Sequence, residues 1–141
     1  MGGRLAALIA GVYEFPERKT ARSAWEIQAL SAREALAEAG LGPRDVDGVF
    51  TVTGTPGVGP LGLLDYLDLN PRYVDSTTIG GASPVAHVHH AAAAIASGRC
   101  SVALVTYGST ALSAGVAVGT RERVTGEYLD QFETIYGVST V

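Results

Sequence analysis

The residues best suited to chemistry stand together in Gly80-Gly81-Ala82-Ser83-Pro84, directly ahead of the apolar run 85–96. A glycine pair lets the backbone approach a ligand, and a helix beginning there would offer free N–H groups to an oxyanion or phosphate. Ser83 has the side chain of an N-cap residue, and Pro84 suits the first helical turn. The stretch therefore predicts a strand-to-helix turn that either binds an anionic oxygen or serves only close packing.

The other reactive side chains lack partners in the sequence. His87, His89 and His90 lie within four residues, but only His87 and His90 would share a helix face, so we expect no three-ligand metal site. Cys100 has no His or Asp nearby in sequence, and a buried free thiol behaves as a small hydrophobe. Ser83 stands in no Gly-x-Ser-x-Gly elbow and has no evident base, so helix capping accounts for it.

Strand ends supply the remaining candidates, because open α/β sheets place ligands there. The predicted substrate-binding residues are Gly80, Gly81, Ser83, Tyr107 and Ser109, and Asp75 is a further lining residue. In the C-terminal stretch, Tyr128, Phe132 and Tyr136 recur at four-residue spacing, which on a helix makes one apolar face. Such a face favours packing against another domain or a partner over a substrate box.

The pattern that positions these residues is one of strands alternating with helices. Strands are predicted at 5–12, 46–53, 72–76 and 101–107, and helices at 23–39, 61–69 and 85–96. The continuous apolar run 5–12 predicts a central strand covered on both faces. The run 85–96 has no charged face, which predicts a helix surrounded by protein, with Gly98 as its left-handed end. This order gives an α/β fold with a mostly parallel sheet.

Composition narrows the class of protein. The chain has 141 residues, 47% hydrophobic, with a net charge of −4 and no run of Lys or Arg, so a nucleic-acid or acidic-membrane partner is not expected. The single cysteine and the absence of a signal-peptide pattern predict a cytoplasmic protein, and no apolar run is long enough to span a membrane. We divide the chain into an α/β core, 1–108, and a loop or excursion, 109–141, after which it looks cut off.

Four stretches in this order resemble the thiolase superfamily: 35–41, 46–49, 80–83 and 91–98, followed by the strand at 102–105. The closest branch is that of the thiolase-like (non-specific) lipid-transfer proteins, which includes aldolases that shorten steroid side chains as CoA thioesters. The resemblance covers only the N-terminal part of such a protein. It implies a layered α/β/α fold with a mostly parallel mixed sheet around a buried central helix.

One departure from the thiolase pattern affects the expected chemistry. Thiolases carry an acyl-accepting cysteine at the start of the central helix, and that position falls near Gly81, where this chain has no Cys. Without a thiolate at the helix dipole, no acyl-enzyme can form by the thiolase route. The catalytic residues therefore stay unassigned. In the aldolase branch, the resemblance implies acid–base groups in the C-terminal half and a companion protein with an OB-like fold.

Three functions remain as alternatives. The first is retro-aldol cleavage of a β-hydroxyacyl-CoA, with coenzyme A present only as part of the substrate and no covalently bound cofactor. The second is a catalytically silent subunit that binds acyl-CoA or lipid, or acts as a scaffold. The third is a true acetyl-CoA acyltransferase, which the absence of any Cys between Gly54 and Arg99 argues against. The resemblance also implies a homodimer.

Overall fold

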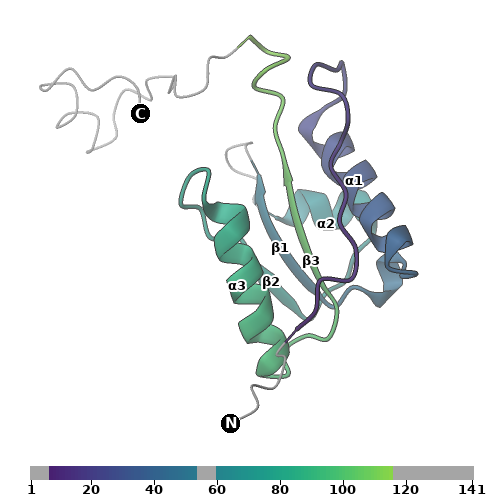
Figure 1. Ribbon diagram of the computed structural model, residues 1–141, viewed down its shortest axis with the longest axis vertical. Helices are drawn as coiled ribbons and strands as arrows, with labels where there is room; N and C mark the ends of the chain where they lie inside the picture. Colours follow the sequence, from purple (N-terminus) through teal and green to yellow (C-terminus); the bar gives the residue numbers. More distant parts are fainter. Residues whose placement is uncertain (1–6, 54–59, 116–141) are drawn as a thin grey trace, which may run out of the picture.

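The computed structural model describes residues 7–53 and 60–115. Two helices lie on one side of a small sheet and a third helix lies on the other (Figure 1). Residues 116–141 lie outside the described residues, and so do the predicted apolar face of Tyr128, Phe132 and Tyr136 and most of the predicted excursion. The elements, in chain order, are α1 (Ala24–Glu38), η1 (Pro43–Asp45), β1 (Gly48–Thr53), α2 (Leu61–Leu67), β2 (Tyr73–Asp75), α3 (Ser83–Ala96) and β3 (Ala103–Gly108).

The sheet has three strands in the order β2-β1-β3, and both pairings are parallel. Gly48 of β1 is in register with Tyr73 of β2 and with Ala103 of β3. Parallel neighbours need crossover connections, which α2 and α3 occupy here. The predicted parallel α/β class is therefore confirmed, although all three described strands are shorter than the sequence pattern suggested.

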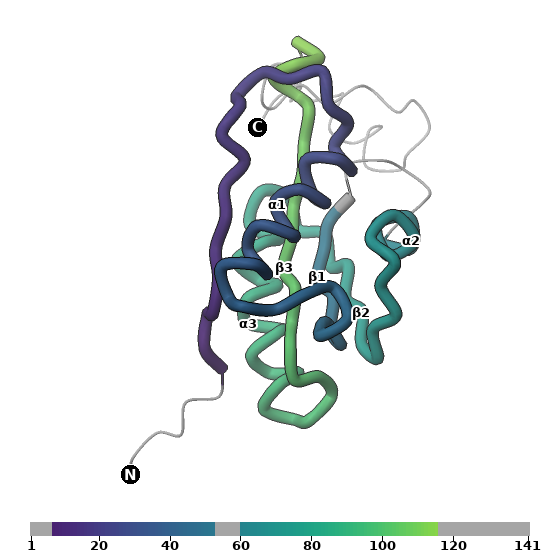
Figure 2. Tube along the Cα trace, turned by 90° about the vertical axis from the view of Figure 1, so that its right-hand side faces the viewer, coloured from purple at the N-terminus to yellow at the C-terminus, as the bar shows by residue number. Residues whose placement is uncertain are grey.

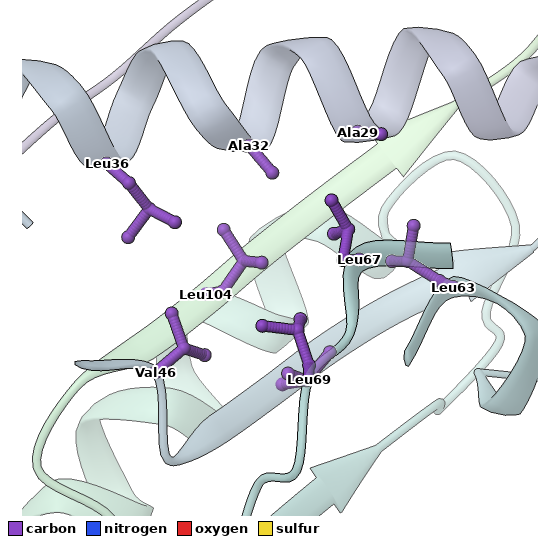
Figure 3. Close-up of a cluster of buried hydrophobic side chains, with 9 residues drawn as sticks. Ala29, Ala32, Leu36, Val46, Leu63, Leu67, Leu69 and Leu104 are labelled. Carbon is purple, nitrogen blue, oxygen red and sulfur yellow. The ribbon is translucent and has the colours of Figure 1, made fainter. Parts of the chain in front are cut away.

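Alternate residues of β1 serve two separate cores. Val49 faces α1 and α2, whereas Phe50 faces α3 and packs with Ala91, Ala94 and Cys100. Figure 2 shows the resulting layers from the side, with α1 and α2 in front of the strands and α3 behind. Figure 3 shows the first core, whose buried members are Ala29, Ala32, Leu36, Val46, Val49, Leu63, Leu67, Leu69 and Leu104.

Helix α1 begins as its sequence predicts. The Ser23 Oγ accepts the Glu26 amide at 3.2 Å, and the Glu26 Oε2 accepts the Ser23 amide at 2.7 Å, which completes a capping box. The hydrogen bond from the Ser23 backbone lowers the pKa of the Glu26 carboxyl. From the buried face of the helix, the Gln28 side chain donates to the Val52 carbonyl at 3.2 Å and so ties α1 to the carboxyl end of β1.

The predicted first strand is wrong for the part of it that the structure describes. Residues 7–12 form no strand, and Leu8, Ile9 and Val12 are 70–78% exposed. The segment lies against α1 instead, where the Val12 amide donates to Glu38 Oε2 at 2.7 Å. Both edges of β1 are already occupied by β2 and β3, so an apolar run alone does not make this segment a central strand.

Helix α3 packs on the sheet as expected, but it is not enclosed. Its inner face buries Ser83, His87, Ala91 and Ala94. The opposite face leaves Val85 75% and Val88 47% exposed, so the prediction of burial on all sides is wrong for the described residues. The absence of charge on a helix indicates that protein covers it, but it does not indicate which residues supply that cover.

Helix ends depend on left-handed residues. Gly98 has φ +72°, as predicted for the residue that ends α3. Helix α2 stops at Leu67 rather than Leu69, because Asp68 takes a left-handed conformation with φ 54° before the expected stop at Asn70-Pro71. No described helix is both long and apolar enough to cross a bilayer.

Candidate functional site

The predicted turn ahead of α3 is closed by the Ser83 side chain. Its Oγ accepts the Ile79 amide at 2.9 Å and donates to the Gly80 carbonyl at 2.7 Å, and the residue is 1% exposed. The helix begins at Ser83, and Ala82 holds the N-cap position. The predicted N-cap role of Ser83 is therefore wrong, because its hydroxyl bonds backward into the turn instead of forward to a helical amide. Ser83 is a residue that shapes the turn.

The glycine pair leaves the start of α3 open. Gly80 has φ +69°, a conformation that favours glycine, and both Gly80 and Gly81 are exposed. Among the described residues other than the immediate chain neighbours, no heavy atom lies within 4 Å of an ideal Cβ at either glycine. In Figure 1 this turn lies at the same end of the molecule as the carboxyl ends of β1 and β3. A ligand oxygen can therefore reach backbone at the positive end of the α3 dipole.

Tyr107 and Ser109 lie at the carboxyl end of β3, as their positions in sequence predict. Tyr107 is 52% exposed, and the Ser109 Oγ accepts the Ala111 amide at 3.3 Å. Within the described residues, neither side chain forms a hydrogen bond with the turn at 80–83. The five predicted substrate-binding residues thus share one end of the sheet, but among the described contacts only Gly80 and Ser83 are hydrogen-bonded to each other.

Asp75, the last residue of β2, joins two elements of this region. Its Oδ1 accepts both the amide and the hydroxyl of Thr77 at 2.8 Å, and its Oδ2 lies 2.7 Å from His90 Nδ1. Burial alone would raise the pKa of the Asp75 carboxyl, but the hydrogen bonds from Thr77 and His90 lower it overall. The carboxylate is therefore ionised at neutral pH.

His87 lies deeper beside the same carboxylate. It is fully buried, neither ring nitrogen has a hydrogen-bond partner among residues 7–53 and 60–115, and its Nε2 is 3.9 Å from Asp75 Oδ1. His89 points to solvent, so the predicted arrangement of the three histidines on the helix is confirmed. The sequence did not lead us to expect Asp75 as the common neighbour of His87 and His90. The available signal was an acidic residue at a strand end followed by two histidines spaced i, i+3 on the next helix.

The only cysteine lies far from the turn in sequence and is inaccessible. Cys100 is 2% exposed, and burial, together with the negative charge of Asp47, raises the pKa of its thiol. Gly48 packs against it so closely that an added Cβ would lie 2.7 Å from the sulfur. A thiol in this environment is a poor nucleophile, in agreement with the structural role predicted for it.

The geometry above defines a parallel α/β protein with an open glycine turn at the carboxyl end of its sheet. No protein-family model matches the chain, and no curated protein matches it. Among solved structures, it is similar to "Ltp2-ChsH2(DUF35) aldolase", with a TM-score of 0.69 and 21% identity over 92% of this chain and 32% of that one. It is also similar to a monomeric SCP2-thiolase like protein type 1 from Mycobacterium smegmatis.

The second similarity has a TM-score of 0.55 and 26% identity, over 67% of this chain and 21% of that one. These neighbours show that the fold is thiolase-like, as the sequence resemblance predicted. The chain spans about a third or less of the length of each structure. The shared region is thus one part of a larger thiolase-like architecture.

Proposed function

We propose that this chain is part of a thiolase-fold protein that acts on acyl-CoA thioesters, with coenzyme A entering only as part of the substrate. The open turn at Gly80 and Gly81, without a cysteine, is the observation that carries the proposal. The position suits a thioester oxygen, but it offers no group that could accept an acyl chain. The similarity to a structure titled as an aldolase supports a lyase over an acyltransferase.

The proposed reaction is retro-aldol cleavage of a β-hydroxyacyl-CoA, such as one from a lipid or steroid side chain. A base removes the proton of the β-hydroxyl, the Cα–Cβ bond breaks, and a ketone or aldehyde leaves. The electron pair of that bond becomes an enolate on the thioester oxygen, which the backbone donors of the turn would stabilise. Protonation at Cα then gives the shortened acyl-CoA. The acid–base groups for these steps belong, by the family resemblance, to the remaining part of the larger architecture.

The proposed setting is a cytoplasmic homodimer that works with an OB-like companion. The aldolase structure names a second component, ChsH2(DUF35), which supports a companion, whereas the SCP2-thiolase like protein is titled monomeric. The uncovered face of α3, with Val85 75% exposed, supports association with further protein. Light scattering on the intact protein at micromolar concentration tests the dimer, and a monomer there contradicts it.

Product analysis tests the reaction. The complete protein, together with any companion, is incubated with a panel of β-hydroxyacyl-CoA thioesters, and release of ketone or aldehyde is measured. Release that falls when Gly81 is replaced by Val supports the proposal, because a branched side chain would cover the open backbone. Binding of acyl-CoA without any release contradicts the lyase and favours the alternative function, a binding or scaffold subunit. The observation that favours this alternative is the Ser83 hydroxyl. It already accepts one hydrogen bond and donates another within the turn, so it is not free to act as a nucleophile.

A further inference from the structure

A second place in the fold combines a cavity with reactive side chains. The cavity has a volume of about 440 Å³ and lies between β2 and the C-terminal half of α3, and none of the residues that line it belongs to the glycine turn. Ala93 and Ala94 line its apolar part. The polar residues that line it are Tyr73, Asp75, His90, Ser97 and Arg99, and the Arg99 guanidinium lies 5.5 Å from the centre of the Tyr73 ring.

The contact between Asp75 and His90 determines which nitrogen of the neutral imidazole carries the proton. An ionised carboxylate only accepts hydrogen bonds, so at 2.7 Å from Asp75 Oδ2 the His90 Nδ1 must donate its proton. A neutral His90 then has its lone pair on Nε2. Within the described residues no hydrogen bond occupies this nitrogen, and the side chain, 35% exposed, lines the cavity. A carboxylate at this position orients the imidazole, so that Nε2 faces away from Asp75.

His87 adds a second imidazole behind the same carboxylate. Its unpartnered Nε2 is 3.9 Å from Asp75 Oδ1 and fully buried. A buried polar nitrogen without a partner is costly, so its position beside Asp75 needs a reason. At 3.9 Å the His87 Nε2 is too far from Asp75 Oδ1 for a hydrogen bond, so donation would need the two side chains to move closer. The other charged group at the cavity is Arg99, and His89 lies outside the cavity lining.

We propose that this cavity is a binding site for a small hydroxy acid anion, whose carboxylate is held by Arg99 and whose hydroxyl donates to His90 Nε2. The guanidinium is always charged and matches a carboxylate in two-pronged geometry. Tyr73 and the alanine methyl groups cover the carbon chain of the ligand. The site is separate from the glycine turn and does not depend on the function proposed for that turn.

The test uses the whole chain, labelled for NMR, titrated with 3-hydroxybutyrate and with butyrate as the matched ligand that lacks the hydroxyl. In the free protein at neutral pH the His90 proton should reside on Nδ1. The Nε2 signal should then shift saturably on addition of 3-hydroxybutyrate, which we expect to bind about threefold or more tightly than butyrate, the worth of one modest hydrogen bond.

Three variants at surface-accessible positions separate the roles. His90→Gln should abolish the preference for the hydroxy acid, and Arg99→Gln should weaken both ligands about tenfold, the loss of one charge-assisted pair. His89→Gln is the control and should change neither affinity. The proposal is overturned if the His90 proton resides on Nε2, if neither acid gives a saturable shift, or if the control variant weakens binding as much as the other two.

Discussion

The carboxylate of Asp47 and the guanidinium of Arg72 lie 2.8 Å apart, and this contact is the outer part of a clamp on the amino ends of all three strands. On its inner side, the Asp47 Oδ1 accepts the amides of Ser101 and Val102 at 2.7 and 2.8 Å, just ahead of β3. The Asp47 carbonyl accepts the amides of Arg72 and Tyr73, at the start of β2. Asp47, which directly precedes β1, thereby sets the position of both neighbouring strands.

Replacing Asp47 with Ala should destabilise the fold by about 2–3 kcal/mol, because two backbone amides lose a charged acceptor. Arg72→Ala should cost less than about 1 kcal/mol, since the guanidinium is 61% exposed and its ion pair is screened by water. Urea denaturation of the two variants and the wild type measures both values. Equal losses for the two variants would show that the ion pair, rather than the amide contacts, is the main contribution.

The same clamp predicts a dependence of stability on pH. Burial raises the pKa of the Asp47 carboxyl, but hydrogen bonds from Val102, Ser101 and Arg72 outweigh it and leave the folded-state pKa below the ordinary value. The stabilisation is therefore complete above the unfolded pKa of about 4 and is lost as the pH falls through the lower folded value. Asp75 shifts in the same direction. Urea midpoints between neutral and acid pH should fall less in Asp47→Asn than in the wild type.

Thr51 should tolerate loss of its hydroxyl. It is fully buried in β1, and in the part of the chain that the structure describes its Oγ1 has no hydrogen-bond partner. Thr51→Val keeps the branched shape and removes an unsatisfied polar group, so we expect unchanged stability or a gain of about 1 kcal/mol. The reverse change two residues earlier, Val49→Thr, should cost about 1–3 kcal/mol. Thermal unfolding of both variants checks the pair, and a large loss in Thr51→Val would mean that its hydroxyl has an unseen partner.

The packing of Gly48 against Cys100 predicts sensitivity to a single methyl group. An added Cβ would lie 2.7 Å from the Cys100 sulfur and 2.9 Å from its Cβ, so Gly48→Ala should cost about 1–3 kcal/mol through overpacking. Gly42→Ala is the control, since the nearest atom to its added Cβ is a side-chain oxygen at 3.8 Å. Chemical denaturation of Gly48→Ala and Gly42→Ala compares their free energies of unfolding. Native Cys100 should also react slowly with iodoacetamide, and the reaction should accelerate in Gly48→Ala as the site loosens.

A thiol placed at the open turn tests the electrostatics of the start of α3. Gly81→Cys has free space around its new side chain, so the thiol should be accessible and its pKa should fall below the ordinary value of about 8.5. Ala93→Cys, exposed in the C-terminal half of the same helix, is the matched control. The pH dependence of iodoacetamide labelling gives both pKa values. Equal values would remove the electrostatic basis for an oxyanion at this turn.

Short stretches of sequence were sufficient to predict some features of the structure. The capping box of Ser23 and Glu26 predicts α1, and Gly98 predicts the end of α3, because each depends on residues within one helical turn. The thiolase-like fold was also predictable, from several short motifs in a fixed order.

Pairing between distant segments was not predictable in the same way. The apolar run at 7–12 has the composition of a central strand, but composition does not indicate that β2 and β3 already occupy both edges of β1. The direction of the Ser83 hydroxyl depends on the path of the turn. The contact between Asp75 and His90 joins a strand end to the middle of a helix, and the histidine spacing alone does not indicate which carboxylate lies beside it.

The parallel order of the strands also has a consequence for how the chain acquires its structure. The hydrogen bonds of Asp47 with Ser101 and Val102 join residues 54 and 55 positions apart, and no hairpin shortens that separation. β1 therefore has an open edge during synthesis until β3 has left the ribosome. Because long loops close slowly, we expect folding to be limited by the arrival and docking of β3, after α1, α2 and α3 have formed.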